Sequence, residues 1–505
     1  MEEKMVRCGT DERTHSDIRQ RAGRLARALG DAGVGYGDRY AIVMRNEIGF
    51  LEATLAGSAI GAIPVPVNWH WTGSELEHLL VDSGSKLAIV HSDFVATVEA
   101  AVPGLPIIEA AVPEAIREAY GLAEVALSGR YPTLEESIAG HAPVTGMPSD
   151  PPLGVIYTSG TTGLPKGILR EPIPAEDFPL IAQATLAAFA ADTSMSTAVT
   201  APLYHTAPNT HAVIALALGM EIEILPRFDA EDFLRFVQER RVEHAQMVPT
   251  MFVRLMKLPA ETRAKYDVSS LRSVVHAAAP CPPDVKRDMI EWWGPIVHEY
   301  YGGSETGVCV HCTSEEWMSH PGTVGRPLFD AGVKILDPYG DSLPVGESGD
   351  IYIKSFTGFP DFTYIGNDAK RRDMERDGYV TVGDVGYLDE DGFLYLNDRR
   401  NDMVISGGVN IYPAEIESCL LGIEGVVDAA VFGIPDAEYG EALAAHLQLE
   451  DGVNFTEEEI RDHVREHLAK YKAPRVVSFD EKLPRDEAGK LFKRRLKEKY
   501  WPAKA

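Results

Sequence analysis

The stretch that decides the fold is Tyr157-Thr-Ser-Gly-Thr-Thr-Gly-Leu-Pro-Lys-Gly167, which continues the strand-like run Val155–Tyr157. Its eleven positions hold three glycines, four serine or threonine residues and one lysine. Glycines let backbone N–H groups approach and surround an anion, the hydroxyls add donors, and Lys166 adds positive charge. The Gly-Lys-Ser/Thr ending of a Walker A loop is absent. The composition therefore predicts a triphosphate-binding loop of another kind, in preference to a flexible surface loop.

Helix and strand signals alternate on both sides of this loop, which predicts an α/β architecture. We expect a helix near Ser16–Leu29, because apolar residues recur there at helical spacing. Short strands are expected at Tyr40–Met44, Lys86–Val90, Glu221–Leu225 and Ser273–Val275.

The pattern changes near Asp398, where a compact unit with its own apolar pattern begins. A capping box, Thr456-x-x-Glu459, predicts the start of a helix inside this unit. The unit is also expected to contain a helix at Ala414–Leu421 and strands at Val426–Phe432 and Leu443–Leu449. A β-hairpin should precede it, with strands Val385–Leu388 and Phe393–Leu396 and the turn Asp389–Gly392. We therefore expect two domains, 1–399 and 400–505, joined by a hinge near Arg400–Asn401.

The charge balance of the chain excludes several classes of partner. The 505 residues include 48 Lys and Arg against 76 Asp and Glu, a formal net charge of −28. An acidic surface repels phosphate backbones and anionic lipids, so we expect no binding to nucleic acid or to a membrane surface. The apolar runs are too short for an integral membrane segment, and no targeting segment is visible. Five scattered cysteines are typical of reduced thiols, so we expect a cytoplasmic protein.

Together with the motifs that follow it, the loop at 157–167 resembles the adenylate-forming superfamily, and most of all its acyl-CoA and aryl-CoA ligases. The resemblance covers nearly the whole chain. It implies a large N-terminal domain of packed β-sheets and helices and a small, mobile α+β C-terminal domain. It also implies two half-reactions with ATP, Mg²⁺ and coenzyme A. A small-molecule carboxylic acid first forms an acyl-adenylate and pyrophosphate; the small domain then rotates, and the CoA thiol displaces AMP.

The second motif of this resemblance is His298-Glu-Tyr-Tyr-Gly-Gly-Ser-Glu-Thr-Gly307. The resemblance implies that Tyr301 stacks on adenine and that Glu305 binds Mg²⁺, a hard cation that prefers carboxylate oxygen. Ser304 stands where threonine is commoner and keeps the hydroxyl. Acetate-activating relatives carry tryptophan at the place of Gly302, so we expect a pocket for an acid larger than acetate.

A third group of residues joins the end of the large domain to the start of the small one. The resemblance implies that Asp384 accepts the ribose hydroxyls and that Arg399 contacts ribose or phosphate. It places the hinge at Asn401 and a loop for thioester formation at Gly407 and Gly408, where missing Cβ atoms would allow the pantetheine arm to approach.

The resemblance assigns the adenylation lysine to Lys490, whose ammonium would stabilise charge developing at the α-phosphate. His205 matches a residue that gates the acyl pocket, and a satisfied core histidine is the competing interpretation. Further substrate contacts are expected at Ala277, Ala279, Gly303 and Val308. The remaining nucleotide contacts are expected at Thr158, Ser159, Gly160, Thr161, Thr162, Gly163, Lys166, Ala278, Gly302 and Ser304.

One further signal and two alternative functions compete with this hypothesis. Cys309-Val-His-Cys312 suggests a metal site, but no second pair of ligands lies at a suitable spacing, so we expect the segment to line or back the acyl pocket. Alternative functions are a stand-alone adenylation enzyme that loads a carrier protein and a catalytically silent nucleotide-binding regulator. The acid stays open among aryl, alicyclic, steroid side-chain and fatty acids, and so does the oligomeric state, a homodimer included.

Overall fold

The computed structural model describes residues 4–146, 148–158, 165–174, 176–400, 402–406, 409–485 and 489–501. Within these residues the largest element is a 15-stranded sheet, parallel in one half and antiparallel in the other. The parallel half, in spatial order, consists of β1 (Met5–Cys8), β10 (Glu221–Ile224), β9 (Ser196–Val199), β11 (His244–Met247), β12 (Ser273–His276) and β13 (Val297–Gly303).

The sheet changes direction after β13, and this change positions the site. The antiparallel half consists of β14 (Gly307–Cys312), β15 (Thr323–Pro327), β22 (Leu394–Arg399), β21 (Asp384–Leu388), β17 (Gly349–Lys354), β16 (Gly332–Leu336), β20 (Tyr379–Val380) and β19 (Glu375–Arg376). At the far edge, β2 (Asp11–Thr14) pairs with β1. The carboxyl ends of parallel strands meet at one edge of a sheet, so the segments that follow β9, β11, β12 and β13 come together there.

Helices cover both faces of the parallel half. Phe233, Phe252 and Met289 are fully buried on one face, against Ala245 and other strand residues. Each such side chain contributes about 1.5–3 kcal/mol to folding. They belong to α9 (Ala230–Arg240), α10 (Pro249–Met256) and α12 (Pro283–Trp293), and the opposite face packs on α7 (Phe178–Ala188) and α8 (Thr206–Ala217).

A second, four-stranded parallel sheet lies on the other side of α1 (His15–Asp31) and α2 (Ile48–Ile60). Its strands are β4 (Ile63–Pro66), β3 (Arg39–Val43), β5 (Ala88–His91) and β6 (Ile107–Ala110), with α3 (Gly73–Asp82) and α4 (Val95–Ala101) on the outer face. Along β3, Ile42 packs toward α1 and α2, while Ala41 and Val43 pack toward α3 and α4. Each strand is therefore buried on both faces, as expected in an α/β protein.

Smaller elements complete the large region. Three strands form a separate antiparallel sheet at one side of the site: β7 (Ile156–Thr158), β8 (Lys166–Arg170) and β18 (Phe362–Tyr364). The remaining helices are η1 (Ser92–Phe94), α5 (Glu114–Tyr120), α6 (Leu134–Ala139), α11 (Ala260–Arg263), α13 (Ser314–Ser319) and α14 (Asp368–Asp373).

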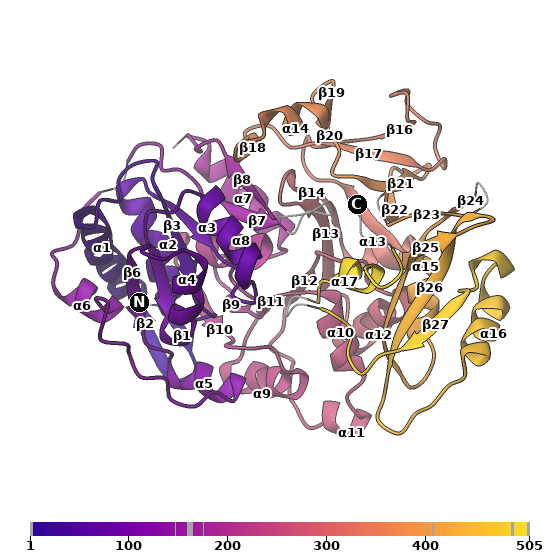
Figure 1. Ribbon diagram of the computed structural model, residues 1–505, viewed down its shortest axis with the longest axis horizontal. Coiled ribbons are helices and arrows are strands. Elements are labelled where there is room, and N and C mark those ends of the chain that lie inside the picture. The colour runs from indigo at the N-terminus through magenta and orange to yellow at the C-terminus, as the bar shows by residue number, and fades with distance from the viewer. Residues whose placement is uncertain are drawn as a thin grey trace.

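Residues 402–501 build a sheet of their own, drawn in orange and yellow at the right of Figure 1. Its strands are β24 (Val409–Ile411), β23 (Val404–Ser406), β26 (Gly440–Leu449), β25 (Val426–Asp436) and β27 (Val476–Phe479). One face packs on α15 (Pro413–Leu421) and α16 (Glu457–His467), and the other packs on α17 (Lys493–Lys497). The 3₁₀ turn η2 (Lys470–Lys472) leads into β27.

The predicted elements are confirmed, with some shifted ends. Both bonds of the capping box form: Glu459 N–H donates to Thr456 Oγ1 at 3.2 Å, and Thr456 N–H donates to Glu459 Oε2 at 2.7 Å. The hairpin pairs Leu388 with Leu394. In contrast, β25 continues beyond the predicted end at Phe432, past Pro435, because its pairing with β26 runs on to Asp436 and Gly440. In the part of the chain that the structure describes, no helix combines the length and apolar character needed to cross a membrane.

Candidate functional site

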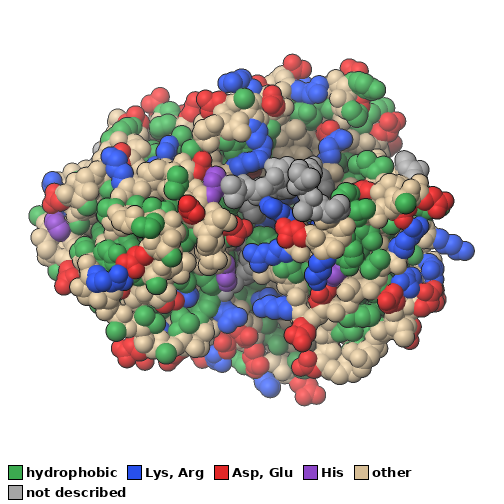
Figure 2. Space-filling view, viewed as in Figure 1, with side chains coloured by type: hydrophobic (Ala, Val, Ile, Leu, Met, Phe, Trp, Pro, Cys, Tyr) green, Lys and Arg blue, Asp and Glu red, His purple; other side chains and the backbone are tan. Residues whose placement is uncertain are grey.

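A cavity of about 590 Å³ opens at the carboxyl edge of the parallel strands. Its walls come from β7 and β8, the start of α8, the turn between β13 and β14, and the β21–β22 hairpin. Lys490 and Phe492 of the C-terminal region close one side. In Figure 2, Lys and Arg side chains gather over the middle of the visible face, where the N-terminal and C-terminal halves meet.

The base of the glycine-hydroxyl loop lies at one end of this cavity. Thr158 and Lys166 both line the cavity and face each other as a cross-strand pair of β7 and β8. Lys370 of α14 also lines it, with Nζ 4.9 Å from the centre of the Tyr364 ring. Burial, together with the nearby Lys166 ammonium, lowers the pKa of Lys370 to about 8. This end therefore collects cationic side chains from two separate segments.

Glu305 lies beside these cations, and hydrogen bonds from Tyr364 and Arg170 hold its side chain and its backbone turn. Its Oε1 accepts a hydrogen bond from the Tyr364 hydroxyl at 2.9 Å. The Arg170 guanidinium donates to the backbone carbonyls of Ser304 and Glu305, at 2.5 and 3.0 Å, and so fixes the turn that carries the carboxylate. Arg170 stacks over Phe359 at 4.7 Å, and burial lowers its pKa to about 10. The Ser304 hydroxyl, which also lines the cavity, lies 2.6 Å from that of Thr206.

Asp384 and Arg399 are brought together by the β21–β22 hairpin. They form a cross-strand pair, with Arg399 Nε 3.4 Å from Asp384 Oδ1, and both line the cavity. The Tyr301 hydroxyl donates to the other carboxylate oxygen at 2.7 Å. Burial and Asp384 raise the pKa of Tyr301 far above its usual value, so the hydroxyl keeps its proton for this bond.

The aromatic predicted to stack on adenine occupies a buried position. The Tyr301 ring packs in the core beside Ile351 and Leu394, and the cavity wall includes its neighbour Tyr300 instead. The stacking role of Tyr301 stays a prediction.

Another part of the cavity lining consists mostly of small and apolar groups. His205 lies there as the residue before α8. The other residues predicted as substrate contacts also line this cavity, and so does Ala278, a predicted nucleotide contact: Ala277, Ala278, Ala279, Gly303 and Val308. Ala278 adopts φ of 76°, a left-handed conformation that costs an alanine about 1–3 kcal/mol. Such strain persists at a site whose surroundings over-determine the backbone.

Gly302 has a backbone reason for being glycine. It lines the cavity, but a Cβ atom built on it would lie 1.9 Å from the carbonyl oxygen of Gly307, across a register shift between β13 and β14. The expected room for a larger acid therefore does not follow simply from a missing side chain at this position. The local backbone would have to move before any side chain fitted.

Lys490 reaches the cavity because the preceding residue allows close contact between the two regions. Gly489 has φ of 79°, and a Cβ atom there would lie 2.2 Å from Thr250 Oγ1 of α10. A second contact joins the regions where Lys257 Nζ donates to the Val426 carbonyl at 2.7 Å. The structure thus brings Lys490 to the same cavity as Glu305 and Asp384.

Several predicted residues lie outside the described part of the chain: Ser159, Gly160, Thr161, Thr162, Gly163, Asn401, Gly407 and Gly408. Cys309 and Cys312 are buried, and burial raises the pKa of both thiols. Neither cysteine lines the cavity, whereas Val308, the residue before this segment, does.

Sequence reasoning missed several residues that line the cavity: Arg170, Gln246, Tyr364 and Lys370. None of them belongs to a motif that the sequence displays. The only signal for Arg170 was its place in the strand directly after the glycine-hydroxyl loop. The others reach the cavity through pairing and packing between distant segments.

Comparisons with known proteins find relatives for both regions of the chain. Residues 2–360 match the family described as AMP-binding enzyme, and residues 415–490 match the AMP-binding enzyme C-terminal domain. The long-chain-fatty-acid–CoA ligase FadD13 of Mycobacterium tuberculosis is 30% identical over 98% of this chain and 95% of its own length. The feruloyl-CoA synthase of an Amycolatopsis species is 31% identical over the same shares.

A solved structure extends the likeness to three dimensions. The o-succinylbenzoate CoA synthetase MenE of Bacillus subtilis, in complex with the acyl-adenylate intermediate OSB-AMP, superposes with a TM-score of 0.82 and 27% identity. The match covers 98% of this chain and 96% of that one. The chain belongs to the AMP-binding enzyme family, within the adenylate-forming superfamily that its motifs resemble.

Proposed function

We propose that this chain is an ATP-dependent acid–CoA ligase. A carboxylate oxygen of the acid attacks the α-phosphorus of ATP, and the bond to pyrophosphate breaks. The thiolate of CoA then attacks the acyl carbon, and AMP leaves with the electron pair of the broken C–O bond. The observation that carries the proposal is one cavity lined by Lys166, Glu305, the Asp384–Arg399 pair and Lys490. Relatives named as CoA ligases for a long-chain fatty acid and for ferulate support it.

Each charged group has a role that its position supports. Lys166 and Lys370 face the β- and γ-phosphates, Asp384 accepts the ribose hydroxyls, and Arg399 orients Asp384. Lys490 bridges the attacking carboxylate and the α-phosphate, where charge builds up in the transition state. His205 and the alanines Ala277 to Ala279 surround the acyl group.

The donor set at Glu305 fits Mg²⁺. Glu305 lines the cavity, one of its carboxylate oxygens accepts a hydrogen bond from Tyr364, and hard oxygen donors are what this cation prefers. Bound Mg²⁺ would neutralise phosphate charge during the displacement. Tyr364 and Arg170 would keep the carboxylate oriented toward it.

We further propose that the chain moves as two units, 1–399 and 400–505. The sheet of β23 to β27 has its own core around Ile416, Val431 and Ile460. Rotation about a pivot near Asn401 would withdraw Lys490 after adenylation and bring the loop at Gly407 and Gly408 to the acyl-adenylate. Thioester formation then proceeds with the unit 400–505 in a second orientation relative to the unit 1–399.

The acyl end favours a medium or bulky acid that carries a hydrogen-bond donor. Gln246 of β11 is fully buried and lines the cavity. Its Nε2 donates to the Met247 carbonyl at 3.2 Å, whereas Oε1 has no hydrogen-bond partner among the described residues. A buried acceptor without a donor costs about 1–3 kcal/mol, which a hydroxyl or amino group on the bound acid would recover.

The test is a pyrophosphate-release assay over acids of graded size, each with and without a donor group, in the presence and absence of CoA. We expect turnover to require CoA and the best acid to be bulky and donor-bearing. If acyl-AMP accumulates in the presence of CoA and only a carrier protein accepts the acyl group, then the thiol substrate is that carrier protein and not CoA. ATP binding without pyrophosphate release from any acid would show a silent nucleotide-binding regulator.

A further inference from the structure

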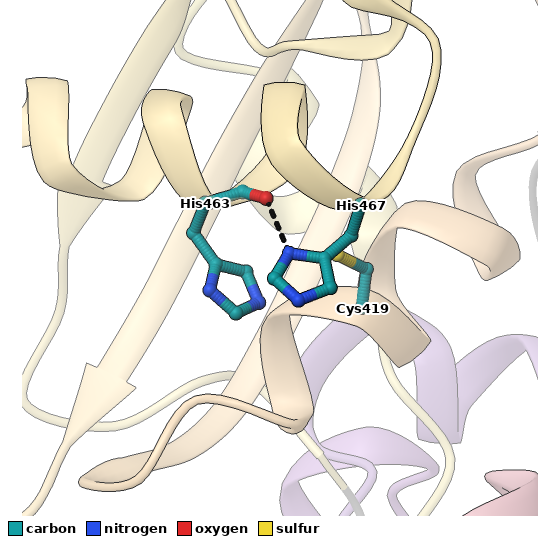
Figure 3. Close-up of side chains that lie close together, drawn as sticks. All are labelled: Cys419, His463 and His467. Carbon is teal, nitrogen blue, oxygen red and sulfur yellow. Dashed lines mark hydrogen bonds between the residues drawn. The ribbon is translucent and has the colours of Figure 1, made fainter.

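Three side chains of kinds that can hold a metal ion lie close together on the C-terminal region, outside the cavity lining. Among the described residues, Cys419, His463 and His467 place one ligand atom each within 4.8 Å of one another. Cys419 comes from α15 and both histidines come from α16, so the cluster joins two helices (Figure 3). None of the three lines the nucleotide cavity.

The two histidines are arranged as a pair on the same side of α16. They are four residues apart, which places them one above the other, and their ring centres are 4.1 Å apart. His467 Nδ1 lies 2.8 Å from the His463 backbone carbonyl. A carbonyl accepts only, so Nδ1 carries the proton and Nε2 keeps its lone pair. A metal-bound imidazole is typically held in this way, by a hydrogen bond from its other nitrogen.

We propose that Cys419, His463 and His467 form a binding site for a divalent transition metal, with Zn²⁺ as the favoured ion. One thiolate and two imidazoles are the nitrogen and sulfur donors that Zn²⁺ prefers, whereas Mg²⁺ and Ca²⁺ prefer oxygen. Tetrahedral Zn²⁺ with bonds of about 2.1 and 2.3 Å would separate its ligand atoms by about 3.5 Å. The ligand atoms lie within 4.8 Å of one another, so small rotations of these side chains would bring them to that separation.

The surroundings allow an ion to enter and give it a structural effect. His467 is exposed, and Cys419 and His463 are half-buried. The opposite faces of the helices are anchored in the core, through Ile416 on α15 and Ile460 on α16. Three protein ligands leave a fourth position for water. A bound ion would therefore cross-link α15 to α16 and stabilise the C-terminal sheet without touching the nucleotide site.

The test uses the full-length chain purified without a histidine tag, with reduced thiols and metal removed by a chelator. Zn²⁺ is titrated in competition with a chromophoric chelator, and Co²⁺ is added separately as a spectroscopic probe. We expect one Zn²⁺ per chain, a higher melting temperature with Zn²⁺, and a thiolate-to-Co²⁺ charge-transfer band. Cys419→Ser should remove the band, and each of Cys419→Ser, His463→Gln and His467→Gln should weaken Zn²⁺ binding at least about tenfold.

Cys281→Ser is the matched control, because Cys281 is the other half-buried thiol of the chain. It should bind Zn²⁺ and Co²⁺ like the unsubstituted protein. Zn²⁺ binding that survives Cys419→Ser, or a Co²⁺ complex without the charge-transfer band, would overturn the site and leave only adventitious binding by surface histidines. Pyrophosphate release by the three ligand variants checks that they fold, and this readout does not depend on the metal.

Discussion

At the scale of the residue, Lys370 lies in surroundings that disfavour its charged form. Burial and the neighbouring Lys166 ammonium lower the pKa of Lys370 to about 8. Its folded-state pKa lies below the usual value for lysine, so the folded chain binds fewer protons than the unfolded chain between that pKa and the usual one. The ammonium therefore costs stability below pH 8, and this cost disappears as the pH rises.

The same titration should appear in nucleotide binding. As the pH rises from 7 to 9, Lys370 loses its charge, and we expect the KM for ATP to increase about three- to tenfold. Lys370→Gln should raise the KM at pH 7 and flatten its pH dependence. Steady-state pyrophosphate release at fixed ionic strength measures both effects. An unchanged pH profile in Lys370→Gln would remove Lys370 from the phosphate site.

A second prediction at this scale concerns Gln246. Replacing it with Met keeps a similar shape and removes the buried acceptor, so kcat/KM for donor-bearing acids should fall about tenfold or more. Acids of the same size without a donor should be unaffected or improved. The comparison of the two acid series on Gln246→Met and the unsubstituted enzyme is the measurement. Equal losses for both series would indicate a packing role only.

At the scale of the element, α16 depends on its first turn. The reciprocal hydrogen bonds of Thr456 and Glu459 satisfy two backbone N–H groups that would otherwise lack partners. Thr456→Ala should destabilise the helix by about 1 kcal/mol. Hydrogen exchange of the α16 amides in the full-length chain should then accelerate about fivefold. Thr456→Ser keeps the hydroxyl and is the control. Equal exchange in Ala and Ser variants would contradict a stabilising role for the cap.

At the scale of the whole molecule, Lys490 and Glu305 belong to different regions and line one cavity, so the proposed adenylation depends on these regions lying together. Lys490→Ala should slow acyl-AMP formation about 10²- to 10³-fold, the usual cost of removing one group that stabilises transition-state charge. Thioester formation from supplied acyl-AMP should change little. Separate assays of the two half-reactions measure this, and equal losses in both would refute the role assigned to Lys490.

The net charge of −28 contrasts with the cationic side chains that line the cavity. ATP, CoA and the acid are all anions, and an acidic protein as a whole repels them. Lys166, Lys370, Arg399 and Lys490 come from four separate segments and concentrate positive charge in one cavity. The global charge describes the outer surface, and the local arrangement serves the reaction.

Much of the fold was predictable because its signals are local. Helical spacing predicted α1, and the capping box predicted the start of α16. The resemblance gave Asp384 and Arg399 as two nucleotide contacts, and the hairpin places them opposite each other. The end of β25 was not predictable in this way, because pairing with β26 outweighs the interruption at Pro435.

The sequence by itself determined the family, the glycine-hydroxyl loop and the order of the elements, because glycines, charges and periodic apolar residues act over a few positions. Only the tertiary structure decided which distant side chains share a cavity or a cluster. Gln246, Arg170 and Lys370 joined the site through sheet pairing and helix packing. Cys419 lies beside the histidines of α16 because α15 and α16 pack on the same face of a sheet. Cys309 and Cys312 are buried and belong to no cluster of potential metal ligands among the described residues. Contacts between residues distant in the sequence depend on strand register and helix packing, which no short stretch of sequence encodes.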